Sequence, residues 1–227
     1  YLSIDNVSVK EVITNNVPRI DYTGGGCGKL LLEPQRTNVV TYSEQFDNAA
    51  WNKEPATTII TANNTTSPDG TQNADLFGSS SPSAVAGVYQ TVIGLTPSAT
   101  YYVSAYVKIG TATNVCITVN NTVAWNTIKG QSFSSADGLN TDTWTRVGFT
   151  FTAPSGANIN YHIGQHQQSG VDPQSTGTFY IWGAQVEQGS YPTSYIPTTT
   201  ATATRIADVC NGAGDASTFN DSEGVLM

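Results

Sequence analysis

Charged side chains are scarce in this chain of 227 residues, and basic ones are the scarcest. Lys, Arg, Asp and Glu make up 11% of the residues, whereas soluble domains usually have about 25%. Nine basic residues stand against 17 acidic ones, and the formal net charge is −8. Because nucleic-acid binding depends on clusters of Lys and Arg that neutralise phosphates, we expect no nucleic-acid partner.

Long apolar runs and paired cysteine motifs are also missing. No apolar run reaches the roughly 18 residues that a transmembrane helix needs, so we expect no membrane insertion. The three cysteines, Cys27, Cys116 and Cys210, show no Cys-x-x-Cys spacing, which excludes a zinc knuckle. Cys116 falls in an apolar stretch and is interpreted as an ordinary core or surface residue. Whether Cys27 and Cys210 pair or stay free thiols is left open.

The sequence is rich instead in Thr, Asn, Ser, Gly and aromatic residues, with four Trp and eleven Tyr. This mixture favours sheets over amphipathic helices. Alternation of apolar and polar residues is clearest over residues 100–109, where Tyr101, Val103, Ala105 and Val107 share one face. Further strands are predicted at 114–119, 147–151, 159–163 and 179–186, with weaker candidates at 38–43, 58–61, 73–77 and 87–92. No helix longer than two turns is expected.

Eight or more short strands separated by turn sequences predict an all-β fold. We expect a two-sheet antiparallel β-sandwich, a jelly roll, with extended N- and C-terminal connector segments.

The start of the chain resembles a stretch near its end. Residues 2–10 match residues 179–187 in apolar phase, and a second pair of similar segments follows each copy. A repeat this long indicates tandem modules, although two β-rich segments can also look alike by chance. We therefore expect residues 1–16 to be the terminal strand of a preceding module and 17–38 a Gly-rich connector. Residues 39–197 would form the complete module, and 198–227 a polar connector and the start of a following module.

Two motifs carry a family resemblance. The leading motif, residues 31–38, reads Leu-Leu-Glu-Pro-Gln-Arg-Thr-Asn and is followed by Tyr42-Ser43-Glu44-Gln45-Phe46 and Trp51. The trailing motif, residues 181–198, contains Ile-Trp-Gly-Ala-Gln-Val-Glu-Gln-Gly-Ser and then Pro-Thr-Ser-Tyr-Ile-Pro-Thr. Together they resemble the carbohydrate-binding jelly-roll modules, typified by xylan- and glucan-binding domains, of phage tail fibres, spikes and other virion appendages.

The resemblance implies a non-catalytic module on the virion surface that binds host-surface or environmental polysaccharide. It also implies homo-oligomers, with a trimer as the guess, and contacts with neighbouring virion proteins. Relatives carried by enzymes often hold a structural calcium. Glu44 and Asp47 lie in the corresponding region, but Trp182-Gly183 replaces the acidic pair usual on the final strand. This replacement disfavours a structural calcium but leaves it open, and we expect no other cofactor.

A sugar site needs flat aromatic rings and hydrogen-bonding groups at their edges. The outward phase of the strands offers such groups, and two loop tryptophans are further candidates for stacking. The predicted ligand-binding residues are Trp51, Tyr102, Tyr106, Trp125, Arg146, His162 and His166. If their strands share a sheet, Tyr106, Arg146 and His162 line one groove, whose cationic members would suit acidic glycans.

Each candidate has a structural alternative. Trp51 could cap the edge of the sandwich, Tyr102 and Tyr106 could face a neighbouring subunit, and the two histidines could be ordinary surface residues. The competing function is a purely structural or oligomerisation module of a fibre or capsid decoration. An enzyme is disfavoured, because glycosidases need two carboxylates roughly 5 to 10 Å apart. Acidic residues here concentrate in turns, with Glu44 and Glu187 as the exceptions.

Overall fold

The computed structural model describes residues 19–21, 29–54, 58–79, 86–165 and 176–208. Two compact units divide the chain, residues 36–205 and the two terminal segments 1–35 and 206–227. The predicted strand at 1–16, Cys27, His166 and Cys210 lie outside the described residues. No helix among those that are described is long and apolar enough to cross a membrane.

The terminal unit joins segments from the two ends of the chain. Its strands β1 (Arg19–Asp21) and β2 (Lys29–Leu31) pair antiparallel. The Glu33 amide donates to Asp208 Oδ2, and the Asp208 amide donates to the Glu33 carbonyl, each at 2.9 Å.

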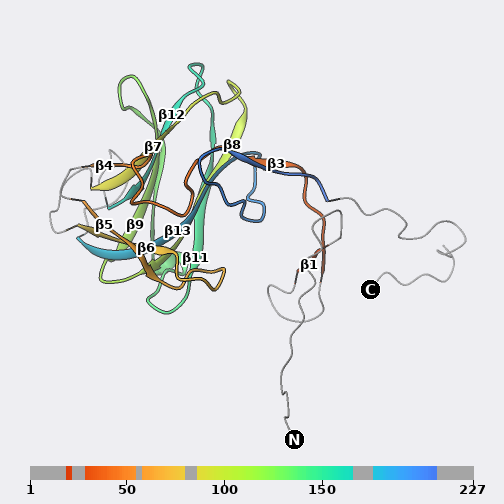
Figure 1. The fold of residues 1–227 in the computed structure, drawn as a ribbon. Helices are drawn as coiled ribbons and strands as arrows, with labels where there is room; N and C mark the ends of the chain where they lie inside the picture. The colour runs from red at the N-terminus through yellow and green to blue at the C-terminus, as the bar shows by residue number, and fades with distance from the viewer. Residues whose placement is uncertain (1–18, 22–28, 55–57, 80–85, 166–175, 209–227) are drawn as a thin grey trace, which may run out of the picture. The chain divides into compact units, whose positions relative to one another are not determined.

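The larger unit is a sandwich of two five-stranded antiparallel sheets (Figure 1). The first sheet has the order β10-β9-β12-β7-β4, and its strands are β4 (Asn52–Glu54), β7 (Gly87–Val92), β9 (Asn114–Asn121), β10 (Thr127–Ser134) and β12 (Ile159–Gly164). The second has the order β11-β8-β13-β6-β5, and its strands are β5 (Ile59–Thr65), β6 (Ala74–Ser79), β8 (Thr100–Ile109), β11 (Thr145–Thr152) and β13 (Gly177–Gln188). A single 3-10 turn, η1 (Ser135–Asp137), follows β10 in the described part of the chain. The predicted all-β sandwich is confirmed.

Alternation along the strands builds the core between the sheets. On β8 the side chains of Tyr101, Val103, Ala105 and Val107 are buried, as their phase predicts. The inward phases of β9 and β12 add Val115, Ile117 and Val119 and then Ile159, Tyr161 and Ile163. Cys116, on the opposite phase of β9, is also buried.

Two further short strands hold the ends of the larger unit together. Strand β3 (Arg36–Asn38) pairs antiparallel with β14 (Ala203–Arg205), and the orange β3 lies beside the blue end of the unit in Figure 1. The buried Asn38 side chain donates to the carbonyls of Ala184 and Ile196 and accepts from the amides of Val40 and Val186. Because all four of its hydrogen-bonding positions are filled, Asn38 fixes the leading segment (residues 36–43) against β13.

The short strands β1, β2 and β4 were not predicted, and three further parts of the strand prediction differ from the structure. The predicted strand at 38–43 is wrong beyond Asn38, because Tyr42 adopts a φ of 49° and its amide bonds the Thr199 carbonyl instead of a sheet neighbour. Strand β10 was not predicted, since Thr-Ile-Lys-Gly-Gln-Ser-Phe-Ser has no clear apolar alternation. Strand β14 lies in a Thr-rich run that reads as a polar connector.

Candidate functional site

The outward face of the three central strands of the first sheet, β9, β12 and β7, carries polar and aromatic side chains instead of charges. On β7 the inward residues Val88 and Val92 alternate with Tyr89 and Thr91 on the outer side. His162 lies directly opposite Tyr89 in the register of β12 with β7, and opposite Thr118 in its register with β9. Residues from three adjacent strands therefore meet on this face.

Three rings form an aromatic cluster on this face: Tyr89, Trp125 and His162. The Tyr89 and His162 rings are stacked, with centroids 4.7 Å apart and an interplanar angle of 5°. The Trp125 ring stands at right angles to the pair, 5.0 Å from Tyr89 and 5.8 Å from His162. Edge-to-face contacts of this kind are favourable for aromatic rings.

The hairpin between β9 and β10 brings Trp125 to the cluster. Asn121 holds the hairpin closed, since its amide donates to the Asn126 carbonyl and its Oδ1 accepts from the Ala124 amide, each at 2.9 Å. Trp125 has a φ of 57°, a left-handed conformation that costs about 1–2 kcal/mol in a residue with a Cβ. Its side chain nevertheless stays 41% exposed. A strained, partly exposed aromatic residue is a reasonable candidate for function.

Amide and hydroxyl groups surround the aromatic cluster. Thr91 Oγ1 donates to Asn160 Oδ1 at 2.8 Å, and Asn120 lies opposite Asn160 in the neighbouring strand. Asn120 Oδ1 is buried and accepts no hydrogen bond. A buried acceptor without a donor is costly unless a ligand or water supplies one. The face therefore presents hydrogen-bonding groups next to its rings.

Burial differs across this face. His162 is only 3% exposed, Tyr89 is half-buried and Thr91 is exposed. Burial raises the pKa of the Tyr89 hydroxyl, and the negative charge of Glu54 on β4 raises it further. The accessible part of the site is therefore its rim, at Trp125, Tyr89 and Thr91.

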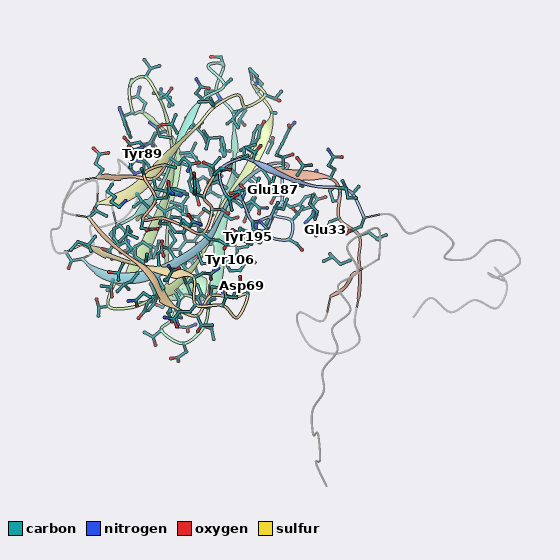
Figure 2. The ribbon with its side chains drawn as sticks, in the orientation of Figure 1. Glu33, Asp69, Tyr89, Tyr106, Glu187 and Tyr195 are labelled. Carbon is teal, nitrogen blue, oxygen red and sulfur yellow. The ribbon has the colours of Figure 1, made fainter. Side chains whose placement is uncertain are left out.

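The structure brings the predicted site residues together in two separate pairs, Trp125 with His162 on the first sheet and Tyr106 with Arg146 on the second. The predicted groove of Tyr106, Arg146 and His162 is wrong, because β8 and β11 belong to the second sheet and β12 to the first. Figure 2 shows Tyr89 well apart from Tyr106. His166 lies outside the described residues.

On the second sheet, Tyr106 and Arg146 contact the trailing segment (residues 189–205). Arg146 Nη1 donates to the Thr193 carbonyl, while its Nε and Nη2 donate to Ser104 Oγ at 3.2 and 3.1 Å. Its guanidinium lies 5.5 Å from the centre of the Tyr106 ring. Tyr106 also contacts Tyr195 edge-on, at 6.3 Å. The face on which we expected a sugar is thus partly occupied by the chain itself.

A buried carboxylate, Glu187, holds this segment. It accepts hydrogen bonds from the Thr193 amide at 2.9 Å, the Thr193 hydroxyl at 2.5 Å and the Gln185 side chain at 2.8 Å. Arg36 and Arg146 each place a nitrogen 3.8 Å from it. In Figure 2, Tyr195 and Tyr106 lie next to each other, and Glu187 lies above them. Two of the unit's cations therefore serve to balance Glu187.

Tyr102 is half-buried on β8 of the second sheet, opposite Thr150 and Glu187. Burial raises the pKa of its hydroxyl, Arg146 opposes that shift and Glu187 adds to it. Tyr102 therefore belongs with the Glu187 region and not with the aromatic cluster.

Trp51 is a core residue, and its prediction as a stacking residue is wrong. The side chain is 1% exposed, and its Nε1 donates to the Tyr42 carbonyl at 2.9 Å. Its ring contacts Phe46 at 4.8 Å and Tyr161 at 5.9 Å. No face of the indole is available to a ligand, because the ring is buried in the core and its N–H group already donates to a backbone carbonyl.

The region considered for calcium holds Glu44 in a hydrogen-bonded setting. Glu44 accepts from the Tyr195 hydroxyl at 3.1 Å and from Asn73 Nδ2 at 3.0 Å. Burial raises its pKa, against the lowering effect of the Tyr195 bond. Among the described residues no three His, Cys, Asp or Glu side chains gather as metal ligands.

A sequence profile of the family described as "Carbohydrate binding domain" matches residues 38–176, more than half of the chain. The chain belongs to this family of carbohydrate-binding domains. Among curated proteins, none matches the chain in sequence.

Solved structures similar to this carbohydrate-binding domain include three with informative names. The enzymatically active domain of tailspike protein 4 from bacteriophage CBA120 has 17% identity and a TM-score of 0.46 over 66% of this chain, but only 21% of the tailspike chain is covered. The CBM22-1 xylan-binding domain of Paenibacillus barcinonensis has 9% identity and a TM-score of 0.44, over 71% of this chain and 96% of that one. The CBM22-1–GH10 xylanase modules of Clostridium thermocellum have 21% identity and a TM-score of 0.46, over 70% and 30%.

Sequence reasoning missed Tyr89, the residue that joins the aromatic cluster to the edge of the sheet. The signal was present, since Gly-Val-Tyr-Gln-Thr-Val alternates and places Tyr89 opposite the apolar phase of Val88 and Val92. Residues 87–92 are a shorter run than 100–109, so their alternation is a weaker signal.

Proposed function

We propose that the outward face of the first sheet binds a neutral polysaccharide without cleaving it. The observation that supports this most directly is the aromatic cluster of Tyr89, Trp125 and His162 beside the amides of Asn120 and Asn160. A ring face can stack on the apolar C–H side of a sugar, while amides and hydroxyls bond its hydroxyl groups.

The distribution of charge favours a neutral ligand. Strands β7, β9 and β12, which carry the aromatic cluster and its amides, contain no Lys, Arg, Asp or Glu. The cations Arg36 and Arg146 lie against Glu187 on the second sheet. An acidic glycan would find no opposite charge on these strands, and Glu54 on neighbouring β4 would repel it.

Catalysis is disfavoured by the same distribution. Hydrolysis of a glycosidic bond needs two carboxyl groups across the bond, and the strands of the site supply none. Glu187, one of the two carboxylates suspected from the sequence, is buried against Thr193 and Gln185. Its hydrogen bonds hold the trailing segment in place.

We further propose that the domain belongs to a phage appendage and attaches it to polysaccharide on a host or in the surroundings. This part rests on the leading and trailing motifs, which resemble those of virion appendage proteins. An oligomer, a trimer in the simplest case, agrees with that setting.

Binding of the full chain to a panel of soluble polysaccharides, by affinity electrophoresis and calorimetry, tests the proposal. We expect binding to at least one neutral xylan or β-glucan and none to polygalacturonate. The variant Tyr89→Ala should lose binding, whereas Tyr180→Ala on the second sheet should keep it. Binding that survives in Tyr89→Ala, binding that is lost in Tyr180→Ala, or a preference for the acidic polymer would contradict the proposal. An oligomer that binds no glycan would favour the structural alternative.

A further inference from the structure

A cavity of about 370 Å³ opens beside the aromatic cluster, where β4 begins at Asn52 and the paired β7 continues past Tyr89. It is lined by Val39, Thr41, Ala50, Asn52, residues 90–93 and Thr202. Strand β4 pairs with β7 only at residues 87–89, so the edge of β7 beyond Tyr89 faces this cavity instead of a neighbouring strand. Volumes of this size are within the range of small-molecule sites.

The wall formed by the leading segment is held by the side chain of Gln90. Gln90 Oε1 accepts from the Thr41 amide at 2.8 Å and the Thr41 hydroxyl at 3.3 Å, and Gln90 Nε2 donates to the Thr41 carbonyl at 3.0 Å. The amide thereby bonds the backbone of Thr41 as an adjacent strand would. This wall is therefore ordered by the domain itself, which favours a preformed site.

The opposite wall comes from the trailing segment. Ala203 pairs with Asn38, so Thr202 lies beside Val39 of the leading segment. The Tyr42 amide donates to the Thr199 carbonyl at 2.7 Å and keeps the two segments together. The cavity is thus built from parts of the chain that are more than 150 residues apart, as the residue numbers show.

The cavity and the aromatic cluster share a border. Asn52 lies directly opposite Tyr89 in the register of β4 with β7. Thr91 is on the same side of β7 as Tyr89, lines the cavity and donates to Asn160 at 2.8 Å. From Tyr89 to Ile93 the extended strand covers roughly 13 Å, which is longer than one sugar ring. One oligosaccharide can therefore reach both places.

We propose that this cavity is a second subsite, which holds the part of a neutral glycan chain that extends beyond the aromatic cluster. Its lining suits a sugar, because Thr41, Thr91 and Thr202 carry hydroxyl groups and Asn52 an amide, while Ile93 is 72% exposed and offers an apolar wall. None of the lining residues is charged. This inference rests on the proposed function, and it adds that affinity depends on the length of the glycan.

The test uses the full chain and a ladder of xylo- and cello-oligosaccharides from disaccharide to hexasaccharide. Thr202→Leu places apolar bulk at the cavity and adds no ring on which a sugar could stack. Thr200→Leu is the matched control, since Thr200 is exposed in the same segment and does not line the cavity. Thermal unfolding of each variant confirms that it folds, and Thr202→Val is the milder substitute if Thr202→Leu does not.

We expect the affinity of the unmodified chain to rise with length. Thr202→Leu should weaken binding of the hexasaccharide roughly tenfold, equivalent to losing one or two good hydrogen bonds, and leave the shortest bound oligosaccharide unaffected. Equal affinities of Thr202→Leu and Thr200→Leu at every length would overturn the subsite and leave the aromatic face standing. Failure of the unmodified chain to bind any neutral oligosaccharide or polysaccharide would overturn the proposed function itself.

Discussion

Tyr89 and His162 lie face to face across the paired strands β7 and β12, with ring centroids 4.7 Å apart. One face of each ring is therefore used by the other. Because His162 is 3% exposed and Trp125 is 41% exposed, the stacked pair serves mainly as a support, and Trp125 presents the most accessible aromatic surface of the cluster.

Replacing Trp125 with alanine should weaken glycan binding about five- to tenfold and leave the free energy of unfolding nearly unchanged. The loss of one stacking ring explains the first effect. The second follows because the indole is partly exposed and its backbone is already strained at a φ of 57°. Calorimetric titration measures the glycan affinity, and urea unfolding measures the free energy of unfolding. Trp144→Ala, immediately before β11 of the second sheet, is the control. Unchanged binding by Trp125→Ala would remove Trp125 from the site.

Replacing Trp51 with alanine should destabilise the domain by about 3–5 kcal/mol, the usual cost of truncating a large core aromatic residue. The indole is buried against Phe46 and Tyr161 and bonds the Tyr42 carbonyl. Urea denaturation gives the free energy of unfolding. Trp51→Phe should cost less, because it keeps most of the buried area. A loss below about 1 kcal/mol for Trp51→Ala would contradict the core role, since that is the range of surface changes.

Glu187→Ala should destabilise the domain by about 3–5 kcal/mol, because it leaves buried donors and two nearby guanidinium groups without their acceptor. Thr193 loses two hydrogen bonds and Gln185 one. Chemical denaturation measures the effect, and limited proteolysis should cut the trailing segment sooner. Glu54→Ala, a partly exposed carboxylate on β4, should change the stability by less than about 0.5 kcal/mol. Equal stabilities of the two variants would be inconsistent with a structural role for Glu187.

Glu44 should make the stability depend on pH. Burial raises the pKa of Glu44 above its usual value of 4.5, and the charge of Asp69 adds to the shift against the opposing bond from Tyr195. A raised pKa in the folded state favours the protonated form. Its stabilising contribution is therefore complete below pH 4.5 and is lost as the pH rises through the folded value. The stability of the unmodified chain relative to Glu44→Gln, measured by urea unfolding at a series of pH values, should fall over that interval. A constant difference would contradict the shift.

The sequence predicted those features that depend on one strand alone, such as its bounds and its buried face. The alternation of residues 100–109 predicted both the bounds of β8 and its buried face, because apolar phase is a property of one strand. The sequence did not predict which strands pair with one another. Tyr106 and His162 have the same outward phase in the sequence, and only the pairing of β8 with β13 and of β12 with β7 separates them onto two sheets.

Contacts between residues far apart in the sequence also explain why the predictions for single residues were wrong. Trp51 stands in a polar stretch, and its burial depends on Tyr161, more than a hundred residues away. The outward face of β8 had the pattern of a free surface, but Glu187 and Arg146 hold residues of the trailing segment on it. That cover comes from a distant and irregular segment, so the alternation of β8 gave no sign of it.

The pairing of β3 with β14 has a mechanical consequence. Arg36 and Arg205 face each other at the outer end of this pair, and Asn38 and Ala203 at its inner end. Tension applied to the chain at both ends of the unit would therefore peel the two strands apart one pair at a time, like a zipper, instead of shearing all their bonds at once. The load would next meet Asn38, whose four hydrogen bonds must break before β13 and the sandwich behind it yield.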